Sequence, residues 1–75
     1  MNKTRLAEIK KISAGLEVLK DNLQSILIEE EWAFESMPEN LQGSERGDRS
    51  QDAQEYLNEV IDKLGEAIEQ LDDIM

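Results

Sequence analysis

The chain has 75 residues, a net charge of −10, and neither cysteine nor histidine. This composition excludes disulfides, thiolate zinc sites and imidazole catalysis, and the acidic charge disfavours direct binding to nucleic-acid phosphates. A single helical domain of this length buries little apolar area. We therefore expect self-association, most simply a homodimer, to supply the missing burial.

Apolar residues recur every three or four positions through the first part of the chain, which is the helical period. The spacing predicts one long helix over about residues 4–36, capped by Asn2 or Thr4. Pro38 disfavours helical backbone just before it and so ends this helix. The predicted core row of this helix is Leu6, Ile9, Ile12, Leu16, Leu19, Leu23 and Ile26.

The first helix carries a second apolar line on another face. It consists of Ala7, Ala14, Val18, Ile28 and Trp32. One hairpin cannot bury both lines, so we expect this second face to form the dimer contact.

Breaker residues follow over about residues 37–47 and predict a turn, with Pro38, Asn40 and Gly43 as its strongest signals. A second helix is expected over about residues 48–73, with Ser44, Asp48 and Ser50 as alternative N-caps. Its predicted core row is Ala53, Leu57, Val60, Leu64, Ala67, Leu71 and Ile74, widened by Tyr56, Ile61, Ile68 and Met75.

The predicted fold is therefore all-α. Residues 1–75 form a single domain, a long antiparallel helical hairpin that dimerises into a four-helix bundle.

Charge is unevenly placed along the chain. Residues 1–28 carry +2, whereas residues 29–75 carry −12. In an antiparallel hairpin the basic start of the first helix lies beside the acidic end of the second helix. The predicted neighbours are Lys3, Arg5, Lys10 and Lys11 on one side and Glu66, Glu69, Asp72 and Asp73 on the other. Acid at the turn has no such compensation and favours a basic partner.

Two carboxylate pairs raise the question of metal chemistry. Glu31 and Glu35 lie one helical turn apart, and Glu59 and Asp62 form a later Glu-x-x-Asp. The pattern resembles the all-helical MazG-type nucleotide pyrophosphohydrolases, and that resemblance would imply Mg²⁺-dependent hydrolysis by these four residues. A solvated acidic face is the interpretation we prefer, because that fold needs more helices than this chain supplies. We expect no enzyme activity, no catalytic residue, no metal site and no cofactor.

Three further residues near the turn carry structural or binding hypotheses. Glu30 falls at a core position, where Arg46 is its expected partner across the turn. Trp32 follows the second apolar face, so burial in the core or dimer is expected, with an exposed binding anchor as the alternative. Phe34 follows the core row.

The stretch from Glu29 to Gly47 reads EEEWAFESMPENLQGSERG. It resembles a small protein type of tailed-phage and prophage genomes, most specifically over Met37 to Gly47. Those proteins have a charged first helix, a similar turn, and a second helix rich in Ala, Ile, Leu and Glu. The second helix here is less alanine-rich. The resemblance implies a phage context but no particular activity.

We expect a phage-type acidic protein that binds and inhibits or modulates a host protein with a basic surface, without binding a membrane, in the cytoplasm. The alternatives are a sponge for a nucleotide signal, held at an oligomer interface by Arg46 or Arg49, and a purely structural helical bundle. The expected partner-binding residues are Trp32, Glu35, Glu39, Gln42, Glu45 and Arg46.

Overall fold

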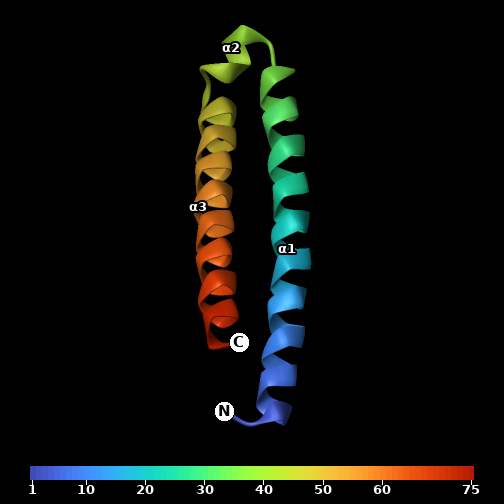
Figure 1. The fold of residues 1–75 in the computed structure, drawn as a ribbon. Helices are drawn as coiled ribbons and strands as arrows, with labels where there is room; N and C mark the ends of the chain where they lie inside the picture. Colours follow the sequence, from blue (N-terminus) through green and yellow to red (C-terminus); the bar gives the residue numbers. More distant parts are fainter.

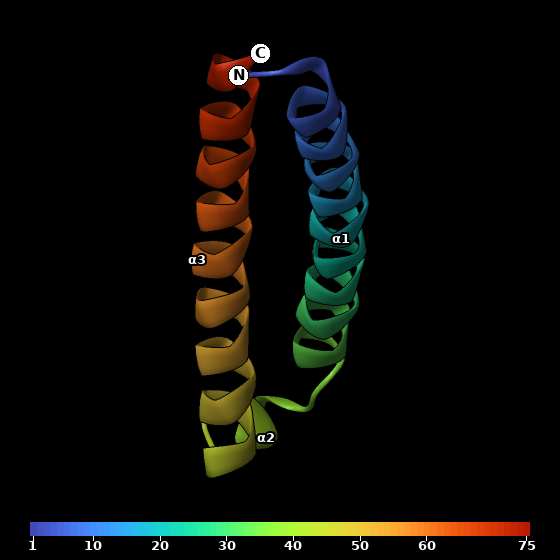
Figure 2. The same ribbon diagram turned by 90° about the horizontal axis from the view of Figure 1, so that it is seen from below.

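The computed structural model describes all 75 residues and contains only helices. These are α1 (Lys3–Glu35), the short α2 (Glu39–Gln42) and α3 (Glu45–Ile74). In both ribbon views α1 and α3 lie side by side and run in opposite directions, with α2 at the turn (Figures 1 and 2). The predicted all-α antiparallel hairpin is confirmed. No helix combines the length and the apolar character that crossing a membrane requires.

The helix ends follow from local chemistry. Asn2 caps α1, because its side-chain oxygen accepts from the backbone N–H of Arg5 at 2.9 Å. At the other end, α1 stops at Glu35, three residues before Pro38. Ser44 occupies the N-cap of α3 with extended backbone, so α3 begins three residues earlier than the predicted residue 48. The turn is correspondingly shorter, and it contains α2, which the sequence pattern did not predict.

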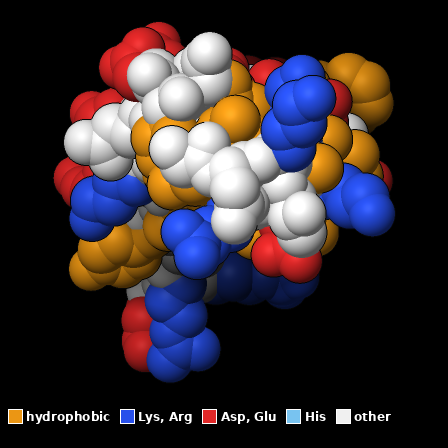
Figure 3. Space-filling view, turned by 60° about the horizontal axis from the view of Figure 1, so that its bottom comes forward, with side chains coloured by type: hydrophobic (Ala, Val, Ile, Leu, Met, Phe, Trp, Pro, Cys, Tyr) orange, Lys and Arg blue, Asp and Glu red, His pale blue; other side chains and the backbone are white.

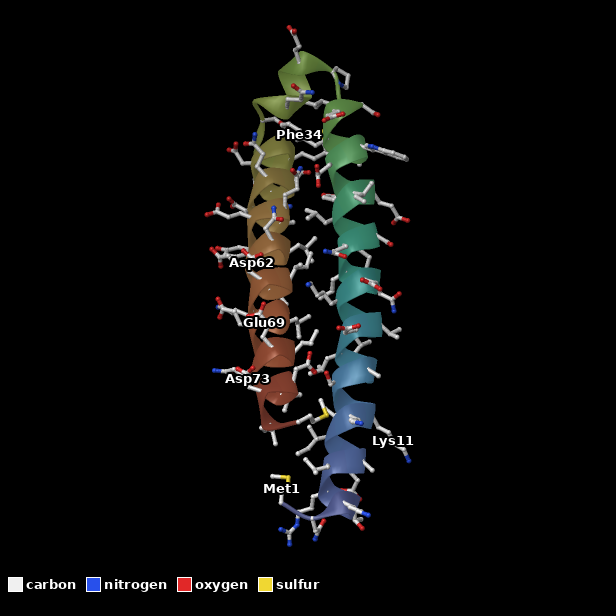
Figure 4. All side chains as sticks on the ribbon, viewed as in Figure 1. Met1, Lys11, Phe34, Asp62, Glu69 and Asp73 are labelled. Carbon is white, nitrogen blue, oxygen red and sulfur yellow. The ribbon has the colours of Figure 1, made fainter.

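The two long helices meet along rows spaced alternately by three and four residues, as in a coiled coil. On α1 the row is Leu6, Ile9, Ser13, Leu16, Lys20, Leu23, Leu27, Glu30 and Phe34, all buried or half-buried. On α3 it is Gly47, Ser50, Gln54, Leu57, Ile61, Leu64, Ile68 and Leu71, likewise buried or half-buried. Phe34 lies between the helices below the turn, as predicted (Figure 4).

The predicted core row of the first helix is wrong at three of its seven members. Ile12, Leu19 and Ile26 are exposed, and Ser13, Lys20 and Leu27 take their places against α3. On α3, similarly, Val60 and Ile74 are exposed while Ile61 and Ile68 are buried. The reason is that each helix carries two apolar rows sharing one line of leucines, and a single neighbouring helix covers only one of the two.

The hairpin is thin, and little of it is buried. Only Leu27, Ile61 and Ile68 form a buried apolar core. The accessible surface is 5775 Å², whereas a compact chain of 8.6 kDa exposes about 4,700 Å². Likewise the radius of gyration is 17.2 Å, against about 11 Å for a compact domain of this length. The isolated hairpin therefore leaves on the order of 1,000 Å² uncovered that a compact domain would bury.

Candidate functional site

The turn is closed by side chain and backbone together. Gln42 donates from Nε2 to the carbonyls of Phe34 and Met37, at 3.1 and 3.2 Å, and so satisfies two oxygens near the C-terminal end of α1. Gly47 packs against the end of α2: a Cβ built there would stand 2.0 Å from the carbonyl oxygen of Gln42. The Ser44 hydroxyl donates to the carbonyl of Leu41. These contacts fix the direction in which α3 leaves the turn.

An exposed aromatic residue lies on the outside of α1. Trp32 is 67% exposed, and Ile28, one helical turn before it, is also exposed. Lys11 points away from α3 (Figure 4), and Trp32 lies three heptads later on the same line of the helix. Glu29 and Glu35 lie one turn away from Trp32 on either side and are exposed. We call Ile28, Glu29, Trp32 and Glu35 the outer patch.

The six residues predicted to bind a partner do not form one surface. Trp32 and Glu35 belong to the outer patch, and Glu39 is exposed at the start of α2. Gln42 is instead engaged in closing the turn, a role that sequence reasoning did not assign to it.

On α3, Glu45 forms an ion pair with Arg49 at 2.6 Å, with both side chains about four-fifths exposed. Its neighbour Arg46 is also exposed. That ion pair is the only one in the structure. The predicted pairing of Glu30 with Arg46 is therefore absent. No ion pair joins the basic start of α1 to the acidic end of α3 either. Lys11 points away from α3, and Asp73 lies on the side of α3 turned away from α1 (Figure 4).

The charge is concentrated toward the turn. Residues 23–63, the half of the hairpin nearer the turn, hold eleven acidic and three basic residues, a net charge of −8. The other half holds seven acidic and five basic residues, a net charge of −2. Figure 3 looks toward the chain-terminal end, where Lys and Arg side chains surround hydrophobic ones. The outer patch lies in the acidic half.

The four carboxylates of the metal hypothesis do not converge. Glu31 and Glu35 are on α1, Glu59 and Asp62 are on α3, and no group of three or more acidic side chains could hold a metal ion.

Two shallow hollows lie away from the turn. One, at the chain ends, is lined by Lys3, Leu6, Ala7, Lys10 and Met75. The other lies on one face of the hairpin, lined by Lys20, Gln24, Ile61, Asp62, Gly65, Glu66 and Glu69, and we call this the polar face. The Lys20 amine is 3.3 Å from where a Cβ on residue 65 would be, so Gly65 makes room for this side chain.

The opposite face consists mainly of residues that the sequence pattern had placed in the core of the hairpin. In an antiparallel pair with this heptad spacing, the residue just before every second contact residue, as Ile12 is before Ser13 and Val60 before Ile61, lies on the same face of both helices. That face carries Ile12, Leu19, Ile26 and Ala33 of α1 and Ala53, Val60, Ala67 and Ile74 of α3, and we call it the apolar face. The heptad repeat of both rows was the signal that could have identified it.

Comparisons with protein-family models, curated proteins and solved structures gave no match to this chain.

Proposed function

We propose that this chain is a non-enzymatic binding protein that contacts a basic surface of another protein through the outer patch. One observation carries the proposal: Trp32 is exposed beside Ile28 and is flanked by the carboxylates of Glu29 and Glu35. Exposed tryptophans are frequent energetic centres of protein interfaces, and a polar rim around such a centre is typical. Both charged residues of the outer patch are acidic, so it favours a partner with Lys or Arg around an apolar depression.

The charge distribution gives this contact a mechanism. The turn half carries −8, so it steers a basic partner toward the end of the hairpin that holds Trp32. Complementary charge chiefly raises the association rate, whereas burial of the indole slows dissociation. Binding should therefore weaken as salt rises, without being abolished while Trp32 is present.

The turn sequence from Met37 to Gly47 supports a phage context, in which the partner is a protein of the bacterial host that is inhibited or modulated by the contact. Gln42 and Gly47 in this segment have structural roles in the hairpin. The partner contact is therefore assigned to the outer patch and to Glu39, and not to the turn as a whole.

The test is capture from bacterial lysate with the tagged parent chain, Trp32→Ala, and Val18→Ala as a matched control. Val18 lies on the same line of α1 two heptads earlier and is similarly exposed. The proposal expects a partner that Val18→Ala retains, that Trp32→Ala loses and that high salt weakens. Equal capture by Trp32→Ala, or capture unaffected by salt, contradicts it.

Trp32 is the only tryptophan, so its fluorescence reports directly on the contact. On adding the purified partner, emission should shift to shorter wavelength and become protected from iodide quenching, because the exposed indole is being buried. Unchanged emission with a bound partner would place the contact elsewhere on the chain.

The structural-bundle alternative is favoured by the extent of exposed apolar surface on the hairpin. It expects no partner beyond the chain itself in the same capture experiment. The nucleotide-sponge alternative stays a prediction, and neither hollow of the hairpin includes Arg46 or Arg49.

A further inference from the structure

The apolar face is a continuous strip along the hairpin. Its Ile12, Leu19, Ile26, Val60 and Ile74 are all exposed. The strip borders half-buried leucines of the contact rows, which are Leu16, Leu23, Leu57, Leu64 and Leu71. Covering it would therefore complete the burial of those leucines as well. Scattered exposed apolar residues are ordinary, but an aligned strip of this length points to an interaction surface.

The two rows of this face are aligned across the hairpin. Ser13 donates from Oγ to Asp72 at 3.1 Å, and Lys20 lies against Gly65, so residue numbers at one level add up to 85. With equal rise per residue in both helices, the same relation holds within one residue along the face. It places Ile12 beside Ile74, Leu19 beside Ala67, Ile26 beside Val60, and Ala33 beside Ala53.

The face is therefore wedge-shaped. Two isoleucines form its level nearest the chain ends, whereas two alanines form its level nearest the turn.

We propose that a second copy of this chain covers the apolar face, related by a two-fold axis that places the two turns at opposite ends of a four-helix bundle. The axis passes midway along both rows, between Leu19 and Ile26 on α1. Each α1 then packs antiparallel to the other α1, and each α3 to the other α3. This arrangement uses a different face of α1 from the one that the sequence pattern suggested for the dimer.

The wedge shape selects this orientation. With the turns at opposite ends, Ile12 meets Ala33 of the second copy and Ile74 meets Ala53, so every outer level pairs a large residue with a small one. With the turns together, α1 would pack on α3 of the second copy at equal levels. Isoleucines would then crowd one end, and alanines would leave a gap at the other. Interior packing tolerates neither overpacking nor voids well.

Charge selects the same orientation. With the turns at opposite ends, the half that carries −8 lies beside the half that carries −2, whereas the alternative brings two halves of −8 together. Arg5 continues the apolar row of α1 by one heptad beyond Ile12. In the proposed dimer Arg5 reaches the level of the second copy's turn, where Glu39 is exposed.

The available area is sufficient for a stable pair. The hairpin backbone measures 58 × 14 Å across its broad face, on the order of 800 Å², which is about what each partner of a standard interface buries. The inference does not depend on the proposed function. The outer patch faces away from α3 and stays free in this dimer.

The test is the oligomeric state of the full chain, measured by sedimentation equilibrium, with two variants that differ by one position. Leu19 and Val18 are 56% and 60% exposed in the single hairpin, so changing either to Glu costs the hairpin itself about the same. Leu19→Glu places two carboxylates in the proposed interface near the axis, and Val18→Glu places them on the outside. We expect a dimeric parent, a dimeric Val18→Glu, and roughly 100-fold or greater weakening of Leu19→Glu dimers.

A monomeric parent at several hundred micromolar overturns the inference. So does a dimer that survives Leu19→Glu or that is lost in Val18→Glu, the latter result pointing to the outer line of α1. If Leu19→Glu unfolds, the melting temperature of the parent decides between the outcomes. It must rise with protein concentration if folding is coupled to this dimer, and independence from concentration contradicts the proposal.

Discussion

The two broad faces of this hairpin contrast sharply, although the same two helices build both. On the polar face, Lys20, Asp62, Glu66 and Glu69 line a shallow hollow beside Gly65, and most of the lining side chains are polar or charged. The apolar face presents aliphatic side chains at every heptad. One-sided placement of apolar residues beyond the contact row is typical of a helix pair that forms half of a larger bundle. The difference indicates which side of the hairpin is built to be covered.

Disrupting the turn should have the largest effect on both faces, because the turn sets the register that aligns the residue rows of α1 with those of α3. Gly47→Ala would bring a Cβ within 2.0 Å of the Gln42 carbonyl oxygen, so α2 and α3 must separate. We expect a loss of at least about 3 kcal/mol in the free energy of unfolding. Urea unfolding followed by circular dichroism, at fixed protein concentration, measures it.

Gly43→Ala is the control for that experiment. Gly43 has an ordinary negative φ of −86°, and a Cβ there meets nothing within 4 Å. Its stability should stay within about 0.5 kcal/mol of the parent. Equal destabilisation by both variants would mean that glycine is needed in the turn for a reason other than this contact.

Removing the Gln42 amide should have the next largest effect. Gln42→Ala leaves the Met37 carbonyl without its donor and removes the second donor of the Phe34 carbonyl, which still accepts from the backbone N–H of Met37. We expect a cost of about 1–2 kcal/mol. Gln51→Ala, at an exposed position of α3, serves as the comparison and should be near neutral. If the two variants unfold at the same urea concentration, the Gln42 amide does not stabilise the turn.

Making the polar face more apolar should reduce the contrast between the faces. Lys20→Leu places an aliphatic side chain in the contact row between Ser13 and Leu27, where Gly65 leaves room. We expect a gain of about 0.5–1 kcal/mol, with less specific association, because a lysine in such a row limits alternative pairings at a cost in stability. Lys11→Leu, on the outside of α1, should give no comparable gain in thermal unfolding.

The smallest effect is expected at the exposed ion pair of α3. Glu45→Gln removes its contact with Arg49, and exposed pairs of this kind contribute less than about 1 kcal/mol. A small decrease in melting temperature at low salt should disappear at high salt. A large decrease at high salt would show that Glu45 has a structural role beyond this pair.

The helical period and Pro38 sufficed to predict an antiparallel hairpin with one break. They did not predict which apolar row faces the partner helix. Ile9, Leu16 and Leu23 belong to both rows of α1, so the choice between Leu19 and Lys20 depends on how the turn orients the helices. That orientation depends on Gly47 and Gln42, whose contacts are with backbone and are invisible to a hydrophobic pattern.

The candidate site was predicted in part. The exposure of Trp32 was predicted only as an alternative to burial. Trp32 belongs to the second apolar line of α1, and its alanine, valine and isoleucine residues also fit a buried contact between helices. The sequence pattern placed Gln42 among the partner-binding residues, whereas its amide donates to the carbonyls of Phe34 and Met37 and closes the turn. The exposed acidic residues around Trp32 could be anticipated, since helix geometry places residues three and four apart side by side.

The most direct test of the proposed assembly is the distance between the two turns. The chain has no cysteine, so Asn40→Cys, at an exposed position of α2, carries a single spin label for double electron–electron resonance. The proposed dimer predicts a distance of about 50 Å between labels, because each turn lies about 17 residues from the axis. A distance below about 25 Å would place the turns together, at the spacing of neighbouring helices and their labels, and would contradict the proposed dimer.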